Sequence, residues 1–234
     1  QAGGRRTIQG ELERAIALVT GQRVTVIGAG RTDTGVHAEG QVIAFDVGWQ
    51  RDDETLMRAL NATLPGDIAL QDIRQHTGFH PRFDAVARVY RYTIVQASQR
   101  QPLLRDRSWQ LSASLDDTAV RRACACLIGT HDFAAFGHAP QGDNTVRVVR
   151  RSEWVAHTTP YGRMCLYHVE ANAFLQHMVR RIVGMLVEVG RGRLNVADFE
   201  AALASGKMVN GVTLAPPQGL VLESVRYPAD EELE

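Results

Sequence analysis

The segment GAGRTDTGVHAEGQ, residues 28–41, places one carboxylate, Asp33, in a loop that is rich in glycine. A carboxylate presented by a loop can act as a nucleophile or as a base. Aspartate and glycine are also common in plain turns, because of their backbone freedom and local hydrogen bonding. The segment therefore allows three interpretations: a plain turn, a phosphate-binding loop, or a catalytic loop that presents Asp33.

The phosphate-binding interpretation fits the sequence poorly. Dinucleotide-binding loops have the pattern G-x-G-x-x-G and open a helix. Gly28 and Gly30 fit this pattern, but Asp33 occupies the position of the third glycine. The residues after Gly35 soon predict another strand, so no helix N-terminus would face a bound phosphate.

The tripeptide Asp33-Thr34-Gly35 also matches the motif of aspartic proteases. Those enzymes need two such loops, because two carboxylates must share one proton. This chain has one copy of the motif, so it would have to dimerise around it. Helices are prominent in the sequence, whereas aspartic proteases are nearly all β. A dimeric aspartic protease is therefore kept only as a remote alternative.

A second group of candidates lies near the C-terminal end of the chain. The segment AFLQHMVRRIVGMLVEVG predicts a long helix over residues 174–189 that is apolar on nearly every side and therefore largely buried. Arg180 and Arg181 lie in its middle, and an unpaired buried charge is costly. One arginine therefore needs an anionic partner, which is either a structural acid or Asp33. Periodicity does not choose between the two arginines.

A third group lies in the segment RVYRY, residues 88–92. Strand alternation places Arg88, Tyr90 and Tyr92 on one face. Tyrosines flanked by arginines suit stacking on an unpaired base. Two core tyrosines with satisfied hydroxyls are the simpler interpretation of the same pattern.

Composition limits the classes of protein. The chain has 234 residues, of which 44% are hydrophobic and 22% charged, as in an ordinary globular protein. No apolar run approaches the roughly 20 residues of a membrane helix. The three cysteines lack the spacing of a disulfide framework or a zinc site. His76 and His80 have a metal-like spacing, but Gly78 and Pro81 argue against a helix there. We therefore expect a reduced, cytoplasmic protein without a metal site.

The elements that position these residues follow from periodicity and turn signals. The expected helices cover residues 8–19, 52–61, 116–128, 174–189 and 196–205. The expected strands cover residues 23–28, 41–47, 67–74, 85–96, 145–157, 163–171 and 219–226. This interleaving predicts an α+β fold with a mixed, largely antiparallel sheet. We place a boundary in residues 97–110. It separates an N-terminal half, 1–100, with the Asp33 loop from a C-terminal half, 101–234, with the arginine helix.

Six stretches in this order closely resemble the TruA family of tRNA pseudouridine synthases. They are AGRTDTGVHA (29–38), LNATLPGDIAL (60–70), FHPRFDA (79–85), RVYRY (88–92), NAFLQHMVRRIVGMLVEVGRG (172–192) and APPQGLVLESVRYP (215–228). Together they extend over nearly the whole chain. The resemblance implies the pseudouridine synthase α/β fold, with two similar halves around a basic cleft. The family's usual first strand, with its Tyr-Asp-Gly motif, has no counterpart here, where the sequence starts at Gln1.

The resemblance also implies an activity. Members of this family isomerise uridine to pseudouridine in the anticodon arm of tRNA, typically at positions 38, 39 and 40, without a cofactor or metal. They form homodimers. A catalytically silent tRNA-binding protein on the same fold is the alternative from another functional class.

Site residues carry over by position within the matching motifs. Asp33 matches the catalytic aspartate, Arg180 the arginine that pairs with it, and Tyr90 the tyrosine that stacks on the target uracil. Arg31 matches an arginine that holds the nucleotide flipped out of the stem, which costs a few kcal/mol. His37 and Arg88 lie in the same motifs, and we expect both to bind substrate.

The choice between the two arginines then becomes a structural prediction. Arg180 shares its helix face with Gly184, which leaves room for a close partner, whereas Arg181 lies nearer Glu188 and His177, which offers it an ordinary surface or interface role. We predict a direct ion pair from Arg180 to Asp33, with nitrogen and oxygen within about 4 Å.

Overall fold

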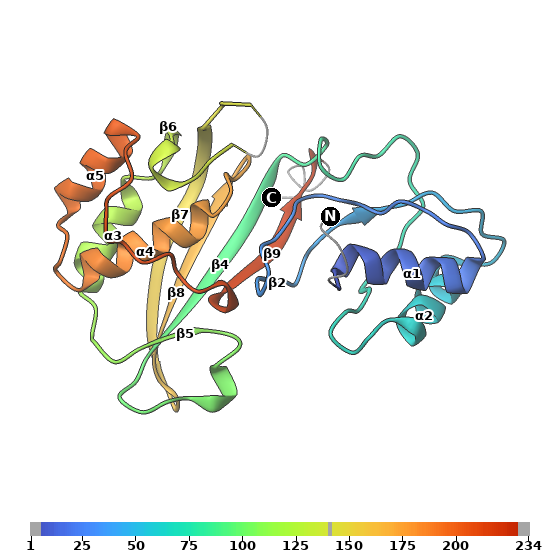
Figure 1. Cartoon of the computed structure of the whole chain (residues 1–234), viewed down its shortest axis with the longest axis horizontal. Coiled ribbons are helices and arrows are strands. Elements are labelled where there is room, and N and C mark those ends of the chain that lie inside the picture. The colour runs from blue at the N-terminus through green and yellow to red at the C-terminus, as the bar shows by residue number, and fades with distance from the viewer. Residues whose placement is uncertain (1–5, 140–141, 229–234) are drawn as a thin grey trace. The chain divides into compact units, whose positions relative to one another are not determined.

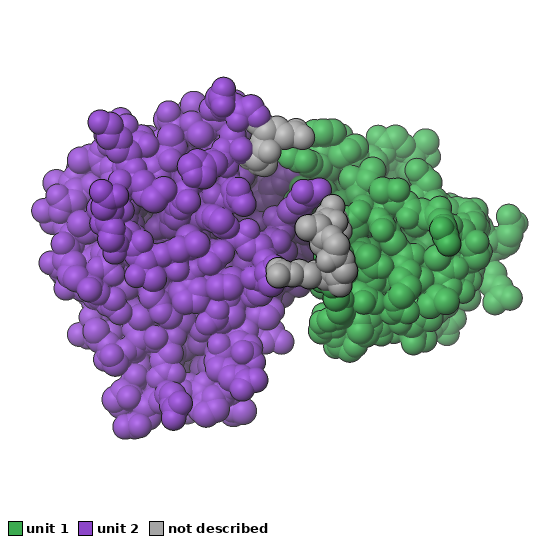
Figure 2. Space-filling model, viewed as in Figure 1, with its two compact units in different colours: residues 1–30, 42–84 green, residues 31–41, 85–234 purple. Residues whose placement is uncertain are grey.

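The computed structural model describes residues 6–139 and 142–228 (Figure 1). The chain forms two compact units, which Figure 2 shows in different colours. The smaller unit consists of residues 1–30 and 42–84, and the larger unit of residues 31–41 and 85–234. The Asp33 loop therefore belongs to the larger unit, together with Tyr90 and Arg180.

The smaller unit is built on two helices, α1 (Ile8–Thr20) and α2 (Asp53–Thr63). Each helix starts at a capping side chain. Thr7 Oγ1 accepts a hydrogen bond from the amide of Gly10, and Asp52 Oδ1 accepts one from the amide of Thr55. The helices bury a small apolar core together with Val26. Its helical members are Leu12, Ala15, Ile16, Leu56 and Leu60. Both helices were expected from the sequence.

Most of the strands expected in the smaller unit do not form hydrogen-bonded ladders. Among the described residues of this unit, only β1 (Ile27–Gly28) and β3 (Ile43–Ala44) pair, in antiparallel fashion. Residues 67–74 form no strand, although Ile68 and Leu70 do pack on the core as an alternating pattern requires. The amide and carbonyl of Leu70 bond instead to the side chain of Asn61. Asn61 thus satisfies the backbone groups that a neighbouring strand would have satisfied.

The larger unit contains one mixed sheet in the order β2-β9-β4-β8-β7-β6. Its strands are β2 (His37–Ala38), β4 (Ala87–Gln96), β6 (Gly129–Asp132), β7 (Val146–Thr159), β8 (Gly162–Ala171) and β9 (Leu220–Arg226). A short strand, β5 (Trp109–Leu111), runs parallel to the end of β4. β2 is parallel to β9, and the remaining pairs are antiparallel. This arrangement confirms the expected α+β fold and the β7–β8 hairpin.

Three helices cover one face of this sheet (Figure 1): α3 (Asp117–Ala125), α4 (Met178–Gly190) and α5 (Val196–Ser205). Single 3₁₀ turns occur at Pro102–Leu104, Ala134–Phe136 and Pro217–Gly219. The core between helices and sheet is aromatic and aliphatic, and includes Tyr92, Tyr167, Phe133, Phe199 and Ile182. α4 is buried along nearly its whole length, as its apolar sequence predicts.

α4 begins later than the sequence predicts. Residues 174–177 lie outside the helix, which starts at Met178. His177 directly precedes the helix in a left-handed conformation, with φ 64° and ψ 4°. This residue separates the non-helical segment before it from the helix. Phe174 and Leu175 extend the apolar pattern of the helix because both pack against the core, although neither lies in a helical turn.

The two compact units are distinguished by the contacts within each of them, and not by a similarity between two halves of the chain. The expected halves, 1–100 and 101–234, and the basic cleft between them stay predictions.

Candidate active site

Asp33 opens a tight turn at the edge of the larger unit's sheet. The amide of Val36 donates to the carbonyl of Asp33 at 3.0 Å, which closes the turn over Thr34 and Gly35. Gly35 has φ 86°, the positive value that a type II turn requires at its third position. A side chain there would also lie 3.1 Å from Pro217. The glycine after Asp33 is therefore explained by the turn, and the turn presents the carboxylate.

The strand that follows fixes this turn to the sheet. β2 pairs with β9 through His37 and Val221. At Gly40 a Cβ atom would lie 2.2 Å from the carbonyl oxygen of Glu223. Only a residue without a side chain allows the chain to approach β9 so closely. Asp33 is thus held a few residues from a rigid element, as a catalytic group needs.

Arg180 meets Asp33 as predicted. Its Nη1 atom lies 2.7 Å from Asp33 Oδ2, and the two side chains are 12% and 29% exposed, respectively. Its Nε donates to the carbonyl of Ala215 at 2.7 Å, and the amide of Ala215 donates back to the carbonyl of Arg180. The guanidinium is therefore fixed on two sides before it reaches the carboxylate.

Gly184 contributes in a different way from the one expected. A Cβ atom there would lie 2.1 Å from the carbonyl oxygen of Thr213. The space beside the helix is thus filled by the backbone of Thr213, and not by Asp33. This close approach brings Ala215 to the helix, where it orients Arg180.

Arg181 makes no ion pair among the residues that the structure describes. Burial lowers the pKa of its guanidinium, and its Nη1 atom is buried without a hydrogen-bond partner there. Glu188, which the sequence offered as its neighbour, pairs with Arg191 and Arg193 instead.

Tyr90 lies on β4, and its ring meets Phe174 edge-on at 5.0 Å between centroids. Burial raises the pKa of Tyr90 to about 12. The positive charge of Arg88 opposes this shift, and the negative charge of Asp33 adds to it. Tyr90 is therefore a neutral phenol at physiological pH, within the electrostatic influence of Asp33. Tyr92, two residues on, is a core residue whose hydroxyl donates to the carbonyl of Pro216.

The remaining candidates differ in placement. Arg88 donates to the carbonyls of Ala85 and Asn172, beside Tyr90. Arg31 is exposed two residues before Asp33, and the described part of the chain gives it no ion pair. The Nε2 atom of His37 lies 2.6 Å from the carbonyl oxygen of Asp106, so its ring contacts the 97–110 segment. The structure therefore brings Asp33, Arg180 and Tyr90 together, whereas His37 is engaged elsewhere.

Sequence reasoning placed His177 near Arg181, and it missed that this residue is a neighbour of Asp33. The Nε2 atom of His177 lies 3.4 Å from Asp33 Oδ2, the oxygen that Arg180 also contacts. Phe174, beside Tyr90, was assigned only to the apolar side of a helix. Both positions depend on the non-helical course of residues 172–177, which the helical spacing of apolar residues conceals.

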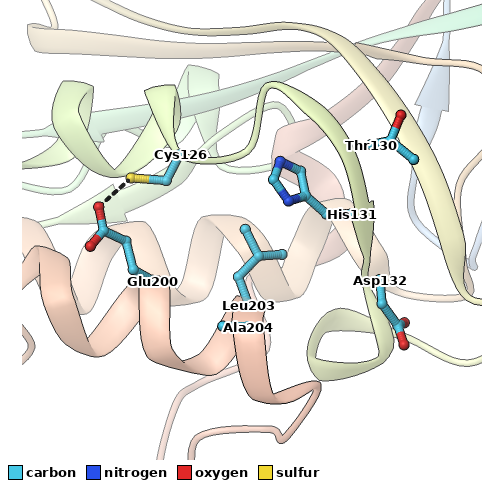
Figure 3. A pocket seen from close by; sticks show the side chains of 7 residues that line it. All are labelled: Cys126, Thr130, His131, Asp132, Glu200, Leu203 and Ala204. Atoms are coloured by element: carbon cyan, nitrogen blue, oxygen red, sulfur yellow. Dashed lines mark hydrogen bonds between the residues drawn. The ribbon is translucent and has the colours of Figure 1, made fainter.

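A separate surface depression of about 530 Å³ lies between β6 and α5 (Figure 3). Within it the thiol of Cys126 donates to Glu200 at 3.1 Å. Burial, with the nearby carboxylate of Glu200, raises the pKa of Cys126 to about 11. The thiol is therefore protonated at neutral pH and a poor nucleophile. None of the candidate site residues lines this depression.

Within the described residues, no helix is long and apolar enough to cross a membrane. The same residues contain no group of three or more side chains that could hold a metal ion.

Comparisons with known proteins identify similar sequences. A family model described as tRNA pseudouridine synthase matches residues 1–84 and 123–228. The tRNA pseudouridine synthase A of Neisseria gonorrhoeae is 42% identical over 230 residues, which is 97% of this chain and 85% of that protein. The protein of the same name from Chloroflexus aurantiacus is 44% identical over 230 residues, 95% of this chain and 81% of its own. That of Citrifermentans bemidjiense is 41% identical over 227 residues, 95% of this chain and 88% of its own.

Proposed function

The chain belongs to the tRNA pseudouridine synthase family, and on that premise we propose that it converts uridine to pseudouridine at positions 38 to 40 of the tRNA anticodon arm. The reaction breaks the bond from uracil N1 to ribose C1′ and forms a bond from C5 to C1′. C5 loses its proton and N1 gains one, so the product is an isomer of the substrate. Atoms and electrons balance without an oxidant, a reductant or a cofactor.

The observation that carries this proposal is the ion pair between Asp33 and Arg180. Arg180 stabilises an ionised carboxylate in a partly buried position, where the charge would otherwise be costly. A carboxylate so placed can act as a nucleophile at the ribose or at the uracil base, or as a general base. The role of Asp33 as the catalytic carboxylate is part of the proposal.

Tyr90 supports the proposal from the other side of the site. A neutral phenol with its ring held by Phe174 offers a flat face and a hydroxyl donor. Uracil that has left the helical stack needs such a partner, because unstacking costs a few kcal/mol. We assign Tyr90 to the target base and Arg31 to holding the flipped nucleotide, with Arg88 and His37 as further substrate-binding residues. The ring of His37 also contacts the 97–110 segment.

The cellular location and the assembly of the protein are part of the proposal. We propose a cytoplasmic homodimer, because the resemblance described above implies that assembly and because tRNA modification takes place where tRNA is used. Analytical ultracentrifugation with and without tRNA measures the assembly directly.

The test uses the 234-residue chain and a tRNA transcript with uridine at positions 38 to 40. Pseudouridine is detected by carbodiimide labelling and primer extension. We expect modification by the unaltered chain, and none above background by Asp33→Asn, with the dissociation constant for tRNA changed by no more than a few-fold.

Three outcomes are distinguishable. Binding of tRNA without modification by the unaltered chain would support the silent binding protein instead. Substantial turnover by Asp33→Asn would remove Asp33 from its proposed role. If the unaltered chain neither binds nor modifies tRNA, the proposed function as a whole is refuted.

A further inference from the structure

His177 has a left-handed backbone, which few residues other than glycine adopt, although histidine is among the types that occur there more often. It is the one non-glycine residue with positive φ among the described residues, at φ 64° and ψ 4°. This left-handed region is disfavoured by the Cβ atom, and glycine or asparagine occupies it more readily than most residues. Strained positions of this kind concentrate at functional sites.

Helix capping does not explain this residue. His177 is the residue before α4, but its side chain makes no capping hydrogen bond to the helix. N-cap residues that accept a hydrogen bond from the first turn usually have an extended backbone, which the left-handed His177 lacks. The imidazole instead lies with Nε2 3.4 Å from Asp33 Oδ2. The left-handed backbone thus directs the ring at the carboxylate and not at the helix N-terminus.

The contacts of Asp33 are divided unequally between its two oxygens. Oδ2 lies 2.7 Å from Arg180 Nη1 and 3.4 Å from His177 Nε2. The described residues provide no hydrogen-bond donor to Oδ1. The two nitrogens reach Oδ2 from the same end of α4, since His177 directly precedes the helix and Arg180 lies in its first turn.

We propose that His177 is a positioning residue for the isomerisation, which with Arg180 holds Oδ2 of Asp33 and leaves Oδ1 as the oxygen that acts on the ribose. A carboxylate held by one donor can rotate about its terminal bond, because that torsion is broad. A second group against the same oxygen, here the His177 ring with Nε2 3.4 Å from Oδ2, restricts this rotation. Small displacements of a reacting group can lower the rate about 100-fold, so the restriction matters for catalysis. The inference rests on the proposed function.

Three substitutions at His177 separate the ring from the backbone. His177→Gly removes the side chain and relieves the left-handed strain. His177→Asn also tolerates the left-handed backbone, but its amide ends about where Nδ1 stands and is too short to reach Asp33. His177→Gln carries an amide N–H about as far as Nε2, but lacks the backbone advantage of asparagine.

The measurement is the single-turnover rate of pseudouridine formation, together with the dissociation constant for tRNA. We expect His177→Gly and His177→Asn to fold with melting temperatures at or above that of the unaltered chain. We expect their rates to fall at least about 10-fold, with tRNA affinity within about 3-fold. His177→Gln should be faster than His177→Asn. A purely conformational role predicts the reverse order, with asparagine and glycine active and glutamine slow, and that order would overturn the inference.

A second measurement does not depend on turnover. The melting-temperature shifts of His177→Gly and Asp33→Asn are compared with that of the double variant. We expect non-additive shifts, because each variant removes the same contact. Additive shifts would overturn the inference even if the unaltered chain proves inactive. Inactivity of the unaltered chain by itself counts against the proposed function and leaves this second measurement to decide the role of His177.

Discussion

Two adjacent arginines in one helix have opposite surroundings. Arg180 is fixed by Ala215 and paired with Asp33, whereas Arg181 is half-buried without an ion pair in the described part of the chain. Residues next to each other in a helix point about 100° apart, so the two guanidinium groups cannot exchange places. The catalytic contribution of one should therefore not be replaced by the other.

We predict that Arg180→Met lowers the rate of pseudouridine formation about 100-fold or more, because loss of one preorganised charged partner has effects of this size. Arg181→Met is the matched control. It removes the same charge from the neighbouring position, and its rate should stay within about 3-fold, because Arg181 has no contact with Asp33. Single-turnover kinetics of both variants, with circular dichroism to confirm folding, make the comparison. Equal losses in the two variants would contradict the assignment of Arg180.

At the scale of elements, helix α4 and the segment of residues 212–216 form one support for the site. Gly184 allows this contact because it has no side chain. A Cβ atom at this position would lie only 2.1 Å from the carbonyl oxygen of Thr213. The atom that would have to move belongs to the backbone, so the contact cannot be relieved by a side-chain rotation. The same segment carries the carbonyl of Ala215, which bonds to Arg180.

We predict that Gly184→Ala destabilises the protein by about 1–2 kcal/mol. Alanine favours a helix over glycine by up to about 1 kcal/mol, but overpacking against a backbone costs about 1–3 kcal/mol or more, so the loss is larger. The rate of modification should fall as well, because Ala215 moves. Gly66→Ala is the control, since no atom lies within 4 Å of its Cβ position, and it should change stability by less than about 0.5 kcal/mol. Urea denaturation measures both; a neutral or stabilising Gly184→Ala would contradict the prediction.

Elements were predictable where local chemistry determines them. Helix α5 has the predicted bounds because Asn195 and Asp198 form a capping box at its start and Gly206 is left-handed at its end. Residues 67–74 alternate correctly but form no strand, because the side chain of Asn61 takes the hydrogen bonds of Leu70. No local pattern reveals that a side chain nine residues away will replace a strand.

The site shows the same limit. Residue type and resemblance were enough to pair Arg180 with Asp33, since a buried arginine needs an acid. His177 was expected beside Arg181 and not beside Asp33, because its contact depends on a left-handed backbone that a helical apolar pattern hides. The reason why Gly184 is needed was also wrong in detail, because a backbone carbonyl and not the carboxylate occupies the space.

At the scale of the whole molecule, the larger unit buries several weakly acidic side chains in neutral form. Burial raises the pKa of Tyr90 to about 12, and raises the pKa values of Tyr92 and Tyr167 further above their ordinary value. Burial also raises the pKa of Cys124 to about 12 and that of Cys165 to about 11. These groups keep their protons in the folded state at pH values where the unfolded chain has begun to release them.

The sign of the pH dependence follows from this difference. Below about pH 9 the tyrosines are protonated in both states, and their contribution to stability is complete. Above about pH 10 the unfolded tyrosines lose protons while the folded ones retain them, so the free energy of unfolding falls as pH rises toward the folded pKa values. Each such group lowers it by about 1.4 kcal/mol per pH unit in that window. Cysteines add to the same trend from about pH 9.

We therefore predict that Tyr90→Phe reduces the alkaline loss of stability. The variant removes one titrating group, and the described residues provide no hydrogen-bond partner that its hydroxyl would leave behind. Below pH 9 the variant should differ from the unaltered chain by a constant offset. Between pH 10 and 11 the free energy of unfolding of the variant should fall less steeply, by about 1.4 kcal/mol per pH unit at most. Urea denaturation at pH 8, 10 and 11 measures both slopes. Parallel curves for the two proteins would mean that Tyr90 ionises equally in the folded and unfolded states, and would contradict its assignment as a buried neutral phenol beside Asp33.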